Sequence, residues 1–538
     1  MATKTYVPEE TVPDESPDSI KDSSGIGGHP AGLTTLFFTE MWERFSYYGM
    51  RALLLLFMVA SPANGGLGFP TAKAASIYGA YTGSVYLTSI PGGWVADKLL
   101  GARLTVLCGG VFIALGHFSM AVPTLPTFFS GLILIVIGTG LLKPNISTMV
   151  GMLYSQDDPR RDAGFSVYYM GINTGALIAP IVCGFLARRP EFKSIVGAFG
   201  LHPENTWHVG FAAAGLGMTF GIIQYLYPRA IRLLLISFGA FMGGLTLVLF
   251  KASVAQLASS SDIFWLLAAV LIGAIVGNEV TRYVTRGEKK RSAELRKHPL
   301  GAIGQRRQAS KETEKVTVPK QPFTRDEKLR MAVVGILFLF ATLFWMAFEQ
   351  AGSSLNLFAD TLTRHNVGSW QFDATYLQSV NSIFLILFAP VFSVLWIRLG
   401  SRQPSSPMKF AIGLLFVSLG FIVVAFASTL TKSGPVGPGW LILVYMLHTF
   451  GELSLSPVGL STVTKLAPAR VVGLMMGIWF LSISLGNYIA GWVAGNFDPK
   501  AEGALLKMFG GVALITLAAA AILAALAPSI RKMMGRVH

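Results

Sequence analysis

Long apolar runs, repeated along the whole chain, constrain this sequence more than any other feature. A helix needs about 20 predominantly apolar residues to cross the hydrocarbon core of a bilayer, and about 14 such runs can be read between Gly, Pro and charged residues. They cover residues 32–60, 72–96, 102–122, 127–153, 162–187, 206–227, 230–252, 262–284, 329–361, 370–398, 408–431, 438–466, 470–496 and 503–528. Only 13% of the 538 residues are charged, against about 25% in a soluble chain. The sequence therefore predicts an all-α polytopic membrane protein.

Basic residues in the loops indicate the orientation of these runs. Loops after even-numbered runs hold most of the Lys and Arg, for example Lys98, Arg160 and Arg398, and such loops face the cytoplasm. Both termini are therefore expected on the cytoplasmic side of the membrane. Residues 1–28 are polar and acidic without an apolar stretch, so we expect the first membrane helix to serve as an uncleaved anchor.

A strongly basic stretch separates the eighth and ninth runs. Residues 282–330 contain 15 Lys or Arg and 6 Asp or Glu, a surplus of nine within a net charge of +15. Nucleic acid could bind such a block, but a segment joining two membrane helices favours a cytoplasmic linker close to lipid headgroups. We predict contact with the bilayer and no nucleic-acid partner.

Traces of an internal repeat lie on either side of this stretch. Gly164 is followed nine residues later by Asn173, and Gly473 nine residues later by Ser482. Two six-helix bundles with a helix pair inserted between them account for 14 helices. The expected divisions are a cytoplasmic tail 1–28, a first bundle 29–227, an inserted pair 228–285, a basic linker 286–328, a second bundle 329–528 and a tail 529–538.

The first run carries an unusual set of polar groups. Offsets of 0, 3, 4, 7, 8 and 11 place six of them on one helical stripe: Glu40, Glu43, Arg44, Tyr47, Tyr48 and Arg51. Each unpaired charge at mid-bilayer costs roughly 2.5–3.5 kcal/mol. The stripe must therefore face a wet cavity or form salt bridges that only lock helices together. Its length favours the cavity.

Three further charges lie within the runs, Lys143, Glu349 and Glu452. Because isolated charges in hydrocarbon are costly, we expect two ion pairs between the halves, Arg51 with Glu349 and Lys143 with Glu452. The cavity would then have a cationic and an anionic wall, which suits a zwitterion. Side chains expected to line it or to bond amides are Tyr47, Tyr48, Tyr81, Trp345, Trp479, Asn173, Asn381 and Ser482.

Signals for an enzyme or an ATP-driven pump are missing from the sequence. It contains no phosphate-binding loop, no nucleophile elbow and no zinc-protease motif. Cys108 and Cys183 lie apart within apolar runs, which argues against a disulfide framework or a zinc site. We expect no cofactor, and expect an ion gradient to drive any movement of solute, with buried carboxylates carrying protons.

Several motifs resemble those of one family. Residues 40–49, EMWERFSYYG, resemble the E-x-x-E-R-F-x-Y-Y-G motif of proton-dependent oligopeptide transporters, and residues 165–175, FSVYYMGINTG, resemble a second signature of that family. Asp97 and Arg103 lie in a loop, GWVADKLLGAR, that is similar to the loop signature of the major facilitator superfamily, in which an Asp and an Arg staple helix ends together. The resemblance extends over about residues 29–528.

The resemblance implies a major facilitator fold of twelve helices plus two and an alternating-access mechanism. By motif, Arg44 and Lys143 would hold the carboxyl end of a peptide, and Glu452 with Asn173 and Asn381 the amino end. The resemblance also implies side-chain pockets shaped by Tyr47, Tyr48, Tyr81, Trp345, Trp479 and Ser482. Proton coupling would involve Glu40, Glu43, Arg44, Arg51, Lys143, Glu349 and Glu452.

The leading hypothesis is therefore a monomeric symporter of protons and di- or tripeptides. A carrier of drugs or organic acids on the same scaffold is the alternative within transport. Arg44 and Lys143 argue against an exporter of cations. A receptor that binds peptides without moving them is the alternative from another class, and a membrane enzyme comes last.

Overall fold

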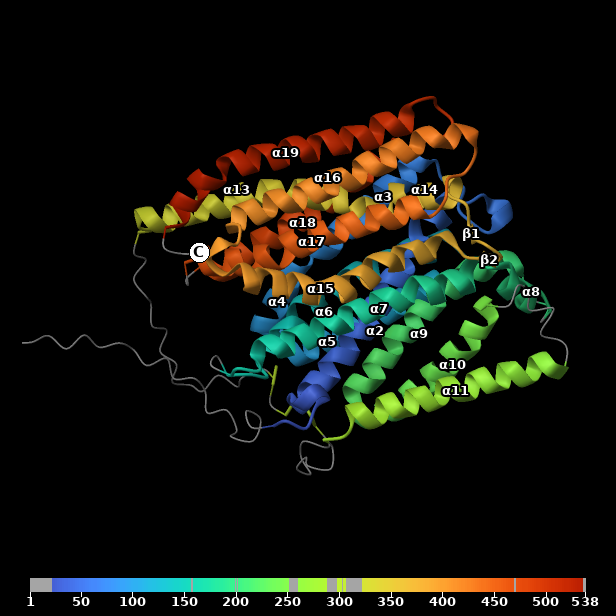
Figure 1. Cartoon of the computed structure of the whole chain (residues 1–538). Coiled ribbons are helices and arrows are strands. Elements are labelled where there is room, and N and C mark those ends of the chain that lie inside the picture. The colour runs from blue at the N-terminus through green and yellow to red at the C-terminus, as the bar shows by residue number, and fades with distance from the viewer. Residues whose placement is uncertain are drawn as a thin grey trace, which may run out of the picture.

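A computed structural model describes residues 22–155, 158–198, 200, 202–250, 260–287, 298–301, 303–305, 322–468 and 471–535. In these ranges the protein is helical apart from one short hairpin, and its long helices run side by side (Figure 1). The predicted all-α architecture is confirmed. Most of the tail 1–28 and of the linker 286–328 lies outside the described residues.

Helices α2–α9, which we call the first half, pack together on one side of the molecule, apart from α3, which lies against α18 of the other half (Figure 1). Their bounds are α2 Ala31–Val59, α3 Thr71–Leu87, α4 Ser89–Val95, α5 Ala102–Met120, α6 Leu125–Gly151, α7 Arg161–Arg188, α8 Pro190–Ala198 and α9 Thr206–Leu226. A π-helical turn, η3 (Ala96–Leu100), joins α4 to α5. The short 3₁₀ turns are η1 Ile26–Gly28, η2 Pro62–Asn64, η4 Pro203–Asn205 and η5 Pro228–Ala230.

Helices α13–α19, the second half, occupy the other side (Figure 1). Their bounds are α13 Arg325–Phe348, α14 Ser354–Leu362, α15 Ser379–Leu399, α16 Ser406–Leu430, α17 Gly439–Leu466, α18 Val472–Ala494 and α19 Ala504–Met534. Strands β1 (Asn366–Val367) and β2 (Trp370–Gln371) form an antiparallel hairpin. The 3₁₀ turns are η8 Glu349–Gly352, η9 Ala374–Gln378, η10 Gly400–Arg402 and η11 Thr431–Ser433.

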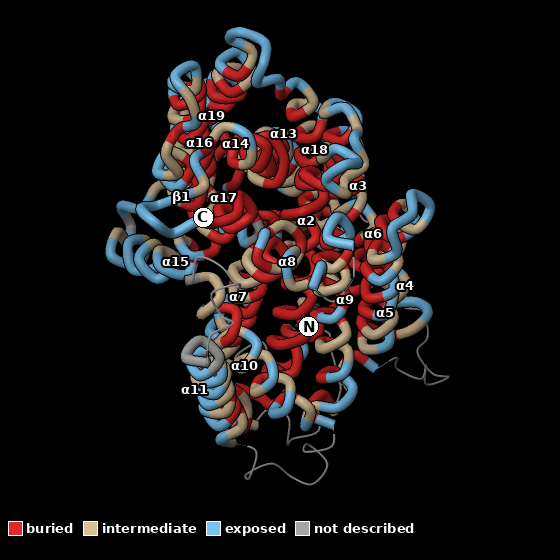
Figure 2. Tube along the Cα trace, turned by 90° about the vertical axis from the view of Figure 1, so that its right-hand side faces the viewer, coloured by how far each residue is buried: buried red, intermediate tan, exposed pale blue. Residues whose placement is uncertain are grey.

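Helices α10 (Ile231–Phe250) and α11 (Ser260–Val284) pack against each other at the edge of the first half. Phe238 of α10 meets Trp42 edge-on, with ring centroids 5.0 Å apart. At the far end of α10, the carbonyl of Leu249 accepts a hydrogen bond of 3.2 Å from Trp370 Nε1 in the hairpin of the second half. The outer face of α11 is exposed and apolar (Figure 2).

Twelve helices of the described part are long and apolar enough to cross a membrane. Helix α2 has 29 residues but carries four charged ones, whereas α3 and α4 have 17 and 7 residues. Large apolar side chains face outward on the spans, for example Leu387 and Ile397 of α15, which are 59% and 75% exposed. This is the distribution expected of a protein surrounded by lipid.

Four predicted segments differ from the structure. The run 72–96 is two helices that meet at Thr88, whose hydroxyl donates to the carbonyls of Ser84 and Val136. The run 329–361 is interrupted at Glu349, where α13 ends. The run 370–398 begins only at Ser379, because Asp373 caps the preceding turn η9. The last helix passes through Pro528, at which the prediction ended it, and reaches Met534.

Helix α2 lies at the centre of the molecule and is buried along almost its whole length (Figure 2). It packs against α7 and α9 within the first half and touches α14 and η8 of the second. A helix surrounded on all sides can bury polar groups only if its neighbours supply partners. The functional site is built around this helix.

The two halves approach most closely where α3 crosses α18. A Cβ on Gly79 would lie 2.8 Å from the Cα of Gly491 and 3.0 Å from the carbonyl of Tyr488. Backbone atoms cannot move aside as a flexible side chain can, so this crossing requires glycine.

We predict that Gly79→Val lowers the apparent midpoint of thermal unfolding of the purified protein, because overpacking costs about 1–3 kcal/mol. Gly510→Val in α19 is the control, since nothing lies within 4 Å of a Cβ at that position. Equal midpoints for the two variants would contradict the close crossing.

Candidate functional site

The stripe on α2 forms one continuous polar cluster in the interior. Arg44 is paired with Glu43, and its Nε lies 3.2 Å from Oε1 of Glu40. The guanidinium carbon lies 5.2 Å from the centre of the Tyr47 ring. All four side chains are buried. The predicted clustering of these residues along one stripe is confirmed.

Part of this cluster lacks hydrogen-bond partners. In the described structure, Arg44 Nη2, Glu40 Oε2 and Glu43 Oε1 are buried and unpaired, and so is the hydroxyl of Tyr81 on α3. Buried polar atoms normally find partners, and exceptions often mark functional positions. The cluster can therefore accept a further anion or a proton.

Arg51 links the two halves. Its guanidinium pairs with Glu349, at the point where α13 ends, and Nε donates to the Tyr78 hydroxyl at 2.7 Å. A Cβ on Gly352 would lie 1.9 Å from that hydroxyl, so only glycine allows this approach. The predicted pair between Arg51 and Glu349 is confirmed.

The predicted pair between Lys143 and Glu452 is not formed. The Lys143 ammonium lies 3.7 Å from the centre of the Tyr86 ring, a cation–π contact within the first half. Glu452 Oε2 accepts a hydrogen bond of 3.4 Å from Asn381, which also donates to Thr449 at 2.9 Å. Each charge is thus held by neighbours of its own half, which is the physical reason that the prediction was wrong for this conformation.

The remaining predicted residues fall into two groups. Tyr48 lies beside the cluster, with its ring 5.8 Å from the Arg51 guanidinium, and Trp345 is buried with Nε1 unpaired in the described structure. Asn173 and Ser482 instead bond the carbonyls of Tyr169 and Trp479 within their own helices. Trp479 packs inside the second half, against Phe410 and Gly459.

Sequence reasoning missed two tyrosines and a second tie between the halves. Tyr78 contacts Arg51 and Tyr86 contacts Lys143. The only available signal was the recurrence of tyrosines around Tyr81 in α3. Arg188 pairs with Asp360 and lies 3.0 Å from Asp373. Nothing in the local sequence links these three residues.

Further hydrogen bonds join the halves at the same end of the molecule. Asn356 donates to the carbonyl of Ala52 at 3.0 Å, Thr375 to that of Pro180 at 3.2 Å and Ser379 to that of Leu177 at 2.7 Å. Together with the ion pairs of Arg51 and Arg188, these contacts fasten α2 and α7 to α14, η9 and α15. The halves are closed against each other on this side.

The loop motif lies at the opposite end of the first half. Arg103 Nη1 donates to the carbonyl of Gly301 at 2.9 Å, and the Arg103 backbone amide donates to that of Gly304 at 2.8 Å. Among the described residues no ion pair joins Arg103 to Asp97. Arg103 fixes a piece of the linker to the start of α5.

A bundle of membrane helices in two halves, with a buried charged cluster between them, defines the class of secondary transporters. Comparison with known proteins identifies the family. The model of the POT family matches residues 103–504, so this chain belongs to the POT (proton-dependent oligopeptide transporter) family.

Similar proteins cover nearly the whole chain. It is 37% identical to the peptide transporter YePEPT of Yersinia enterocolitica, over 95% of this chain and 96% of the relative. It is 35% identical to a di-/tripeptide transporter of Lactococcus lactis, over 95% and 98%. A crystal structure of a mutant POT peptide transporter with alafosfalin aligns at a TM-score of 0.72 and 34% identity, over 96% and 98%.

Removing one partner of the Arg51–Glu349 pair leaves a buried charge alone, which costs about 3–5 kcal/mol. We therefore predict that Arg51→Gln and Glu349→Gln each lower the apparent thermal midpoint in detergent, and that the double variant recovers part of the loss. Fluorescence-detected size exclusion after heating measures these midpoints.

The exposed pair Lys432–Glu502 is the matched control, with side chains 69% and 84% exposed. Exposed pairs contribute about 0–1 kcal/mol, so Lys432→Gln and Glu502→Gln should change little. Similar effects at both pairs, or fully additive losses in the double variant, would contradict the buried tie.

Proposed function

We propose that this protein imports di- and tripeptides together with protons by alternating access. The observation that carries the proposal is the polarised interior, with Arg44 and Lys143 on the first half and Glu452 with Asn381 on the second. Membership of the POT family confirms the predicted class of activity, proton-coupled peptide transport. The roles of individual residues are proposed below.

The two ends of a peptide would bind opposite walls. Arg44 has a free donor at Nη2, and it holds the terminal carboxylate together with Lys143. Glu452 accepts the terminal ammonium, aided by Asn173 and Asn381. Because the charged groups recognise the termini and the backbone, side chains can vary. Pockets between Tyr47, Tyr48, Tyr81, Trp345, Trp479 and Ser482 would accommodate them.

Protons would act by neutralising carboxylates that hold cations. Protonation of Glu349 removes the charge that pairs with Arg51, so the closed side loses one of its main ties. Glu40 and Glu43 share Arg44, and a proton on either frees the guanidinium for a substrate carboxylate. Protonation of Glu452 would likewise remove the negative charge that holds the peptide ammonium, and so release that end of the peptide. Protons are the only coupling ion proposed, with no cofactor.

We propose that α2 and the broken α3–α4 also span the membrane, in addition to the twelve apolar helices, which gives 14 membrane spans. The charges of α2 are tolerated because partners surround it, and the break at Thr88 is bridged by hydrogen bonds. The halves then form two six-helix bundles, 29–227 and 329–528, with α10–α11 as the inserted pair. The last helix continues six residues past the second bundle's predicted end.

We also propose the orientation that the basic loops favour, with both termini in the cytoplasm. We further propose that the protein is a monomer in the inner membrane. In this orientation the closed side, with Arg51 and Arg188, faces outward. The linker piece at Arg103 faces the cytoplasm. The described conformation then corresponds to one that is sealed from the outside.

The decisive test is uptake of labelled dialanine into proteoliposomes with an inward proton gradient. Wild type should accumulate the peptide, and an uncoupler should abolish accumulation. Lys143→Ala and Glu452→Ala should each reduce gradient-driven uptake to the level of empty liposomes, because each removes one pole of the site. Lys507→Ala on α19 is the control for loss of a lysine.

The exchange of peptide across the membrane without a gradient distinguishes a role of Lys143 in proton coupling from a role in peptide binding. Exchange that survives in Lys143→Ala would assign this lysine to coupling, whereas loss of exchange would assign it to binding. Wild-type accumulation in both variants would overturn the polarised site. Binding of dialanine without flux in wild type would overturn transport in favour of a receptor.

A further inference from the structure

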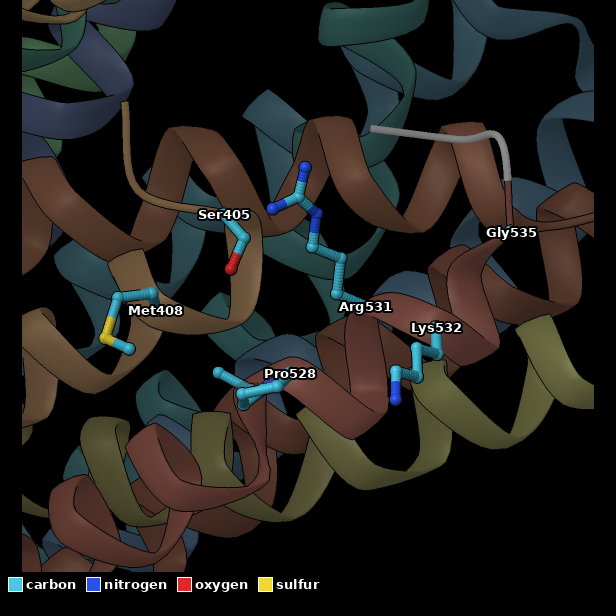
Figure 3. A pocket seen from close by; sticks show the side chains of 7 residues that line it. Ser405, Met408, Pro528, Arg531, Lys532 and Gly535 are labelled. Carbon is cyan, nitrogen blue, oxygen red and sulfur yellow. The ribbon is translucent and has the colours of Figure 1, made fainter. Parts of the chain in front are cut away.

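A pocket remote from the α2 cluster opens between the start of α16 and the end of α19. Its volume is about 470 Å³. It is lined by Ser405, Met408, Ala527, Pro528, Arg531, Lys532 and Gly535. Figure 3 shows the residues that line the pocket. Both helices leave the proposed membrane at this level, so the pocket would lie at an interface between lipid and water.

Two cations line this pocket without an anionic partner. Within the described ranges, neither Arg531 nor Lys532 forms an ion pair, whereas Lys432 and Arg282 at other helix ends each pair with a glutamate. Basic residues in a last helical turn also favour the carbonyl end of the helix. That effect accounts for their presence in the sequence but not for the cavity beside them, toward which Arg531 extends from α19 (Figure 3).

The opposite wall is the first turn of α16. Ser405 precedes this helix and makes no side-chain capping bond. Pro407 has no N–H, and the Lys409 amide donates to the Ser405 carbonyl at 2.9 Å, which leaves the amides of Ser406 and Met408 for a ligand. The positive end of a 25-residue helix thus faces two cations across one pocket, an arrangement that attracts an oxyanion.

The lower part of the pocket is apolar. Met408, Ala527 and Pro528 line it. A free inorganic phosphate would gain nothing from such a surface. A molecule with an anionic head and a hydrocarbon chain would use both parts.

We propose that this pocket binds an anionic phospholipid, with Arg531, Lys532 and the start of α16 around the phosphate and the acyl chain along Met408 and Pro528. Basic pockets between membrane helices on the cytoplasmic side are suited to such headgroups. The site depends on the proposed position of the membrane and not on the proposed substrate. Its occupant would bridge α16 and α19, which pack against each other in the second half.

Native mass spectrometry of the full-length protein, titrated in detergent with phosphatidylglycerol and with phosphatidylcholine, tests the proposal. Wild type should retain phosphatidylglycerol more tightly. Arg531→Gln/Lys532→Gln should weaken its binding by about thirtyfold, from the contribution of two basic residues near an anionic lipid, and leave phosphatidylcholine unchanged.

The matched control is Arg398→Gln/Lys465→Gln, which removes two exposed cations from the same end of the second half without touching the pocket. This variant should bind phosphatidylglycerol as wild type does. Equal weakening in the two double variants, or equal affinity of wild type for the two lipids, would overturn the site. If millimolar inorganic phosphate displaced phosphatidylglycerol, the site would be one for a free anion, and the proposal of a phospholipid site would be overturned.

Discussion

Burial of Arg51 is the constraint on which the rest of the structure depends. A guanidinium inside a bundle of helices costs several kcal/mol unless a carboxylate and further hydrogen bonds compensate it. Here the carboxylate comes from the other half, through Glu349, and the hydrogen bond from Tyr78 of α3. Arg51 is therefore compensated in this way only while the halves are joined here, so the stability of the closed side depends on the charge of the Glu349 carboxylate.

The distribution of paired and unpaired groups is asymmetric along the axis. Near Arg51 and Arg188 the polar groups named here find partners across the halves. Deeper in the molecule, Lys143 and Glu452 are held by neighbours of their own half, and atoms of Arg44, Glu40 and Glu43 remain unpaired in the described structure. The interior thus contains one region whose charged groups pair across the halves and another whose polar atoms remain unpaired in the described structure.

Sequence reasoning predicted what depends on local pattern and missed what depends on contacts between distant segments. Hydrophobic runs predicted almost every helix, and the spacing on α2 predicted its stripe, because both follow from helical geometry alone. The pairing of Arg51 with Glu349 was predictable because few buried charges were available. The tie of Arg188 to Asp360 and Asp373 was not, since exposed-looking charges at loop ends carry no signal of burial. Lys143 was assigned to Glu452 by charge alone, whereas Tyr86 is the neighbour in this conformation.

Helices α10 and α11 are attached unequally to the two halves. Rings pack them on α2 through Phe238 and Trp42, whereas the hairpin of the second half reaches them through the Trp370 indole and the Leu249 carbonyl. In a rearrangement that separates the halves, the ring packing between Phe238 and Trp42 would be kept and the hydrogen bond between Trp370 and Leu249 would break. Helices α10 and α11 would therefore move together with the first half. A fluorophore on its lipid-facing side would serve as a fixed reference point for that half, and Trp370, already at the boundary, as a native reporter of separation.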